Sequence, residues 1–293
     1  MMSCRGRIIG GEADIRPGAN GDSRMNKGQQ CGRNLFPAIR FRRRAYIASV
    51  EEWIERQVRE RQPPVGRPPV MFQRWLDLLF LHWMIDPERV QRTLPRGLSV
   101  DTYKGMAWIG IVPFCMTGVR PVMLPVVSSH FLELNLRTYV IDRHGSPGVW
   151  FYSLDANHPF AVWMARLFFG LPYQHSKMNV ERRNEGIRYS AQRSGSPSVQ
   201  EYRFRPSDDL GEAQIGSLEF FLIERYRLFA VRRAQLVTGR VYHSPYKLEK
   251  AVASRFDKSL FELDGLQPPP GPPDSVLYSA QVDVTVYPVE AVY

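Results

Sequence analysis

Short segments in which apolar and polar residues alternate dominate the chain from residue 71 onward. Alternation with a period of two is typical of β-strands, because successive side chains point to opposite faces of a sheet. The pattern predicts strands over 75–83, 98–103, 106–116, 130–141, 149–154, 178–183, 187–193, 199–205, 225–230, 236–243 and 276–286. With so many strands and so few helices, we expect an α+β protein, mainly antiparallel, whose sheet closes into a barrel or bends strongly.

Helical periodicity is confined to short segments. Helices are predicted over 45–61, 158–169 and 217–224. A short helix is predicted to begin at Pro87 and to end before Leu94, and two helical turns are predicted between 248 and 263. Asp86 and Ser217 are the expected N-caps of two of them, because Asp and Ser side chains accept hydrogen bonds from the first free backbone N–H groups. Gly170 is the expected end of the helix over 158–169.

The first 70 residues differ from the rest in charge. They hold thirteen Arg and one Lys against seven acidic residues, which is +7 of the total net charge of +10. Residues 1–44 have no periodicity and are predicted to be disordered. Residues 62–69 are predicted to form a Pro-rich linker. We therefore divide the chain into an Arg-rich extension (1–70), which a start codon at Met71 would remove, and a barrel domain (71–293). The alternative is that the extension is an Arg-rich arm that binds nucleic acid or a membrane. The cluster Arg42-Arg43-Arg44 alone supports this alternative.

The number of cysteines and the length of the apolar runs indicate the cellular compartment of the protein. Three cysteines are too few and too scattered for a disulfide framework, which favours the cytoplasm. Cys115 lies in an apolar run and is predicted to be a buried, inert thiol. No apolar stretch reaches the roughly 18–20 residues that span a bilayer, and no secretory signal is visible. We expect neither a membrane nor a nucleic acid as a partner.

Common catalytic signatures are absent. The chain has no Gly-x-Gly-x-x-Gly, no P-loop, no Gly-x-Ser-x-Gly, no His-Glu-x-x-His and no paired Cys-x-x-Cys. Its six histidines show no metal-ligand spacing, and a metal site could come only from distant strands. No cofactor or metal is therefore expected.

The predicted strand over 130–141 carries polar residues in an unusual place. One of its faces is lined by leucines, as in a packed core, whereas Glu133, Asn135 and Arg137 lie on the other face between aromatic residues. On a solvent-facing strand these would form an ordinary charged surface. In a barrel they would point inward, where charged groups are costly unless they pair or bind a ligand.

Several motifs resemble the acetoacetate decarboxylase superfamily and, more closely, its YqjF-like family of uncharacterised bacterial proteins. The resemblance covers roughly residues 71–290. It rests on Asp77-Leu-Leu-Phe-Leu-His-Trp83, Glu133-Leu-Asn-Leu-Arg-Thr-Tyr139, Ser153-Leu-Asp-Ala156, Gly170-Leu-Pro-Tyr173 and Glu224-Arg-Tyr226. It implies a closed or cone-shaped barrel with short outer helices around a largely apolar cavity.

The resemblance also assigns residues. Glu133 matches the decarboxylase glutamate, but Tyr173 and Gln174 stand where the superfamily has its lysine pair, and Gly110 matches the position of a second acid. A tyrosine cannot form an imine with a ketone, and Lys177 is not at the matching position. Schiff-base decarboxylation is therefore not expected.

These observations define a hypothetical pocket and two candidate functions. The pocket contains Glu133 and Tyr173 as catalytic residues and Asn135, Arg137 and His175 as ligand-binding residues, with Arg137 pairing with Glu133 or with a ligand carboxylate. One candidate is a lyase, hydratase or hydrolase that acts on a small oxo-acid without a Schiff base. The other is a non-catalytic small-molecule binding or sensing protein. The resemblance also implies a homo-oligomer for either candidate.

Overall fold

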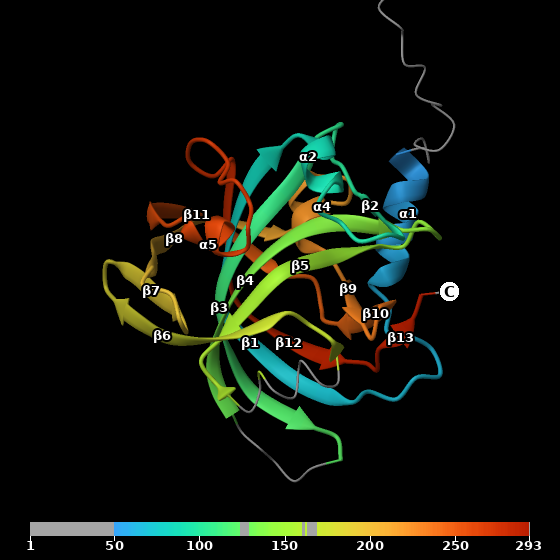
Figure 1. The fold of residues 1–293 in the computed structure, drawn as a ribbon, viewed down its shortest axis with the longest axis horizontal. Coiled ribbons are helices and arrows are strands. Elements are labelled where there is room, and N and C mark those ends of the chain that lie inside the picture. The colour runs from blue at the N-terminus through green and yellow to red at the C-terminus, as the bar shows by residue number, and fades with distance from the viewer. Residues whose placement is uncertain (1–49, 124–128, 160–161, 163–168, 293) are drawn as a thin grey trace, which may run out of the picture. The chain divides into compact units, whose positions relative to one another are not determined.

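The computed structural model describes residues 50–123, 129–159, 162 and 169–292, which belong to one compact unit (Figure 1). Its strands are β1 (Met71–Ile85), β2 (Leu98–Val100), β3 (Ala107–Pro121), β4 (Ser129–Asp142), β5 (Pro147–Ala156), β6 (Tyr173–Arg183), β7 (Gly186–Arg193), β8 (Gln200–Glu212), β9 (Arg227–Arg232), β10 (Gln235–Tyr242), β11 (Lys247–Phe256), β12 (Ser275–Val286) and β13 (Glu290–Ala291). Its helices are α1 (Val50–Glu60), α2 (Pro87–Gln91), α4 (Leu218–Ile223) and α5 (Ser259–Leu263).

Hydrogen bonding closes the described sheet in two ways. One closed ring contains nine strands: β1, β3, β4, β5, β6, β7, β8, β11 and β12. A second ring of seven strands shares β1, β3, β4, β5 and β12 with the first and is completed by β9 and β10. Neighbouring strands are antiparallel except at β5–β6 and β5–β9, which are parallel. The predicted α+β barrel is confirmed, with a sheet that is mixed rather than wholly antiparallel.

The five strands that the two rings share have one face in the interior of each ring. Leu132, Leu134 and Leu136 of β4 pack in a cluster with Trp83 and Phe261. The opposite face of the same strands packs in a different cluster, which includes Phe80, Phe114 and Phe131. Because side chains alternate along a strand, each shared strand contributes to both interiors.

The second face of β4 is buried, not exposed. Glu133 is 3% and Asn135 4% exposed, although both are polar. The interpretation of this face as a solvent-exposed charged surface is therefore wrong, and the interior interpretation is confirmed.

Two predicted helix starts are confirmed. Asp86 Oδ1 accepts hydrogen bonds from the backbone N of Glu88 at 2.8 Å and of Arg89 at 3.1 Å. Ser217 Oγ accepts from the backbone N of Phe220 at 3.1 Å. These caps satisfy N–H groups that the helix itself leaves free.

One helix prediction is wrong. Residues 247–256 form strand β11, and only Ser259–Leu263 is helical. β11 pairs with β8 and β12, so its backbone groups are satisfied by long-range partners that local propensity does not reveal. Most of the predicted helix over 158–169 lies outside the described residues.

Helix α1 packs directly on the barrel beside α4 (Figure 1). The rings of Trp53 and Phe221 stack with centroids 5.7 Å apart. Gln57 Nε2 donates to the carbonyl oxygens of Phe220 at 2.7 Å and Glu224 at 2.8 Å, which caps the end of α4. The proposed boundary at residue 70 would separate α1 from these contacts, and that division of the chain stays a prediction.

We expect the substitution Trp53→Ala to lower the free energy of unfolding by about 2 kcal/mol, because it uncovers Phe221 and removes a half-buried ring. Urea denaturation of the full chain measures this difference. Glu55→Ala, on the exposed side of the same helix, is the matched control. Equal unfolding midpoints for the two variants would show that α1 does not stabilise the barrel.

Candidate functional site

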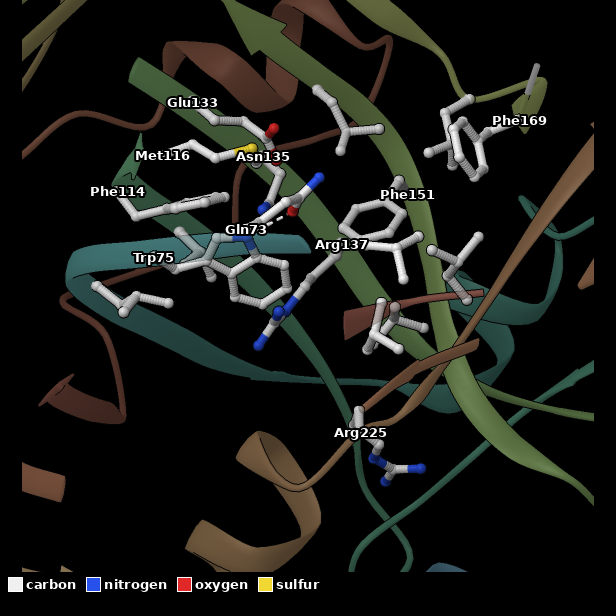
Figure 2. A pocket seen from close by; sticks show the side chains of 18 of the residues that line it. Gln73, Trp75, Phe114, Met116, Glu133, Asn135, Arg137, Phe151, Phe169 and Arg225 are labelled. Carbon is white, nitrogen blue, oxygen red and sulfur yellow. Dashed lines mark hydrogen bonds between the residues drawn. The ribbon is translucent and has the colours of Figure 1, made fainter. Parts of the chain in front are cut away.

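A cavity of about 230 Å³ lies inside the seven-strand ring (Figure 2). All seven strands of that ring contribute to its wall, and Tyr173 at the start of β6 adds to it. Most of the wall is apolar and much of it aromatic, including Trp75, Phe80, Phe114, Phe131, Phe151 and Tyr246. The polar side chains of the lining are Gln73, Glu133, Asn135, Arg137, His158, Tyr173, Arg225 and Arg227.

Strand β4 places three of the predicted site residues in a row. Glu133, Asn135 and Arg137 follow one another along the strand and point to the cavity (Figure 2). β4 is held by β3 on one side and by β5 on the other, so the row sits on a rigid element. The hydroxyl of Tyr189 also donates to the backbone carbonyl of Glu133 at 2.8 Å.

Glu133 and Tyr173 form a buried pair. The Tyr173 hydroxyl donates to Glu133 Oε2 at 2.6 Å. Burial raises the pKa of Glu133 to about 7, although hydrogen bonds from Tyr173 and Asn135 act in the opposite direction. Burial and the nearby Glu133 raise the pKa of Tyr173 well above its ordinary value, so this side chain stays a protonated phenol.

The parallel pairing of β5 with β6 brings Tyr173 to this place, because Leu154 lies opposite Tyr173 in the register. A buried polar cluster fixes the pairing. Asp155 accepts from Ser176 Oγ at 2.6 Å and from Arg193 Nη2 at 2.7 Å. Since every member has a partner, the cluster can hold β6 in one register.

Arg137 does not pair with Glu133. Among the described residues no carboxylate oxygen lies within 4 Å of its guanidinium, and its Nε has no hydrogen-bond partner. The guanidinium carbon lies 5.6 Å from the ring centre of Phe80 and 5.8 Å from that of Tyr139. Four residues along a strand separate two Cα atoms by about 13 Å, which explains why the pair does not form. Arg137 is a half-buried cation that faces the cavity without a carboxylate partner in the part of the chain that the structure describes.

Two arginines of the cavity were not predicted as site residues. Arg225 Nη1 lies 2.7 Å from Asp101 Oδ2, and Arg227 Nη2 lies 3.0 Å from Glu60 Oε1. Arg225 is thus paired with Asp101, whereas Arg227 shares the carboxylate of Glu60 with Arg240, whose Nε lies 3.2 Å from Glu60 Oε2. The motif Glu224-Arg-Tyr226 was a sequence signal for Arg225, but nothing local in it indicates a cavity.

His175 does not line the cavity, so its predicted membership of the pocket is wrong. It is half-buried, and its Nδ1 lies 2.9 Å from Ser194 Oγ. After Tyr173, β6 leaves the cavity and continues into the nine-strand ring, so the next residue on the same side of the strand lies elsewhere. Gln174 is not part of the lining either.

Neither a described lysine nor a side chain at the position of the second acid reaches the cavity. The described lysines 104, 177, 247, 250 and 258 all lie away from the cavity lining. Gly110 packs against His82, because a Cβ at this position would lie 2.6 Å from His82 Cδ2. The position that matches the second acid therefore has no room for a side chain.

Cys115 is buried, and burial raises the pKa of its thiol, as expected for an unreactive cysteine. Among the described residues no cluster of three or more His, Cys, Asp or Glu side chains is arranged to hold a metal ion. None of the described helices has the length and apolar character needed to cross a membrane.

The fold and the cavity define a barrel of the acetoacetate decarboxylase type. A solved acetoacetate decarboxylase superposes with a TM-score of 0.56 at 11% identity, covering 82% of this chain and 97% of that one. The enduracididine biosynthesis enzyme MppR complexed with pyruvate gives a TM-score of 0.53 at 15% identity, covering 78% and 91%. At such identities the likeness establishes the fold alone.

Sequence comparison defines the family. Residues 72–283 match the DUF2071 family, described as an uncharacterized conserved protein. The uncharacterized protein YqjF of Bacillus subtilis (strain 168) is 37% identical over 223 residues, which are 75% of this chain and 91% of that protein. The chain belongs to this family.

Because the pKa of Glu133 rises on folding from 4.5 to about 7, the native state holds a proton between these values that the unfolded state has lost. The free energy of unfolding should therefore fall as pH rises through this window. We expect Glu133→Gln to abolish this fall, so that the variant gains on the order of 3 kcal/mol over the wild type between pH 4.5 and 8.

Denaturant unfolding at a series of pH values measures the difference. Glu185→Gln, which changes an exposed turn residue, is the matched control. Parallel curves for Glu133→Gln and the wild type would contradict the raised pKa.

Proposed function

We propose that the protein is an acid–base enzyme that acts on a small oxo-acid as a lyase, hydratase or hydrolase, without a Schiff base. One observation carries this proposal: Arg137, a cation without a carboxylate partner among the described residues, and Glu133, a carboxyl group with a pKa of about 7, face the same apolar cavity. Perturbed titratable groups that converge on an apolar pocket are typical of catalytic sites.

Arg137 is suited to hold the carboxylate of such a ligand. A guanidinium can bind a carboxylate through two parallel hydrogen bonds, and the apolar walls strengthen this interaction because little water competes with it. The cation–π contacts with Phe80 and Tyr139 keep the group in place while leaving it without an anionic partner among the described residues.

Glu133 is suited to move a proton. A group whose pKa lies near the working pH can both accept and donate protons, and a carboxyl group with a pKa of about 7 meets this condition. Tyr173 stays protonated and donates to Glu133 Oε2, so we assign to it the positioning of Glu133 rather than the role of a base.

The absence of lysine from the described lining supports a mechanism without an imine. Amine catalysis requires a nucleophilic nitrogen, which the phenol of Tyr173 does not supply. The fold similarity to MppR, which was solved with pyruvate, supports oxo-acids as a ligand class.

A second candidate is a non-catalytic binding or sensing protein. It is favoured by the Tyr173–Glu133 hydrogen bond, which engages both groups, and by the mainly apolar wall. Glu133 and Arg137 would be expected to neutralise each other in a cavity built only to bind an apolar molecule. Their separation favours the enzyme.

Proton transfer can be tested before the natural substrate is known. We expect the full chain to exchange deuterium from D₂O into the carbon next to the carbonyl of 2-oxo- and 3-oxo-acids, as followed by proton NMR. Glu133→Gln should slow this exchange by at least about 100-fold, the usual size of a general-base contribution. Tyr173→Phe removes a hydrogen bond that lowers the pKa of Glu133, so the rising limb of the pH–rate profile should move to higher pH.

Glu185→Gln is again the control and should exchange at the wild-type rate. Borohydride added during exchange should leave the protein unlabelled. A covalent adduct would contradict the mechanism without an imine. A ligand that binds through Arg137 but undergoes no exchange would support the second candidate.

A further inference from the structure

Of the three arginines in the described lining of the cavity, one has no carboxylate partner. Arg225 pairs with Asp101 at 2.7 Å, and Arg227 pairs at 3.0 Å with Glu60, which also pairs with Arg240. Arg137 is the cation of the described lining that has no carboxylate partner. A ligand with one negative charge would supply the carboxylate partner that Arg137 lacks among the described residues. A second negative charge would meet no further cation without a carboxylate partner in the described lining, and Glu133 would repel it whenever that carboxyl group is ionised.

The volume of the cavity sets the size of the ligand. A dry cavity of about 150 Å³ takes up benzene, which has six carbon atoms. At the same density a cavity of about 230 Å³ holds roughly nine non-hydrogen atoms. An acid of only three carbons would leave much of the wall uncovered and would forgo the burial of apolar surface, which contributes about 25 cal/mol per Å².

The spacing of the polar groups agrees with a longer ligand. Figure 2 shows Arg137 and Glu133 at opposite ends of the row on β4, with the rings of Trp75 and Phe151 beside the space between them. Their Cα atoms are about 13 Å apart by strand geometry. A molecule whose carboxylate lies at Arg137 must extend along the aromatic walls before another part of it reaches Glu133.

We propose that the ligand of this cavity is a monocarboxylate that carries an apolar group about as large as an aromatic ring. The inference rests on the proposed function and narrows its substrate class, because it excludes both the shortest oxo-acids and the dicarboxylates. The carboxylate binds Arg137, and the apolar group packs against the aromatic walls.

Four probes of matched structure test this inference by isothermal titration calorimetry with the full chain. Phenylacetate has the required charge and ring, phenylacetamide lacks the charge, propanoate lacks the ring, and phenylmalonate adds a second carboxylate. We expect phenylacetate to bind at least tenfold more tightly than each of the other three. A hydrogen-bonded charge pair and a buried ring each contribute enough for a factor of this size.

Variants of Arg137 distinguish the loss of its charge from damage to the folded cavity. Arg137→Met should remove the preference for phenylacetate over phenylacetamide while leaving the affinity for the amide within about threefold, because the apolar walls remain. Arg137→Lys should restore part of the preference, since it keeps the charge. Arg92→Met changes an exposed arginine that directly follows α2, and the variant should bind all four probes like the wild type.

The results distinguish this inference from the function on which it rests. If propanoate or phenylmalonate binds as tightly as phenylacetate, and Arg137→Met abolishes that binding, the inference is overturned while the proposed carboxylate site stands. If no carboxylate binds, or if Arg137→Met binds phenylacetate like the wild type, both are overturned.

Discussion

Both closed rings depend on the pairing of β4 with β5, where they diverge. It joins the two strands directly, so that the nine-strand ring closes through β6 and the seven-strand ring through β9. Because β4 alternates leucines with Glu133, Asn135 and Arg137, the same strand contributes to a packed core on one face and to the polar part of a cavity on the other. A slip of one residue would place the polar row in the packed core.

The site costs stability. Burial of Glu133 disfavours its charged form, and the hydrogen bond from Tyr173 offsets only part of that cost, since the pKa of Glu133 still rises to about 7. Arg137 adds a cation without a carboxylate partner among the described residues. Such uncompensated groups are tolerated mainly where they serve a ligand or a reaction, because mutation to apolar residues would otherwise be stabilising.

Much of the fold could be predicted from local patterns. Alternation located most of the strands, and Asp86 and Ser217 marked two helix starts, because these signals depend on neighbours in the chain. The two faces of 130–141 were also assigned from alternation. Lys247–Phe256 was not recognised as a strand, since its partners β8 and β12 lie far away in the sequence. The packing of α1 on α4 escaped prediction for the same reason.

For the site, the sequence by itself determined that Glu133, Asn135 and Arg137 share one face of a strand, because side-chain alternation is a property of the strand alone. Only the tertiary structure decided that this face looks into a cavity, that Tyr173 reaches Glu133, and that His175 does not. It also placed Arg225 and Arg227 in the cavity wall and gave each a carboxylate partner, whereas Arg137 has none among the described residues. These outcomes depend on which strands pair and in which register, and that choice is made by long-range hydrogen bonds and burial.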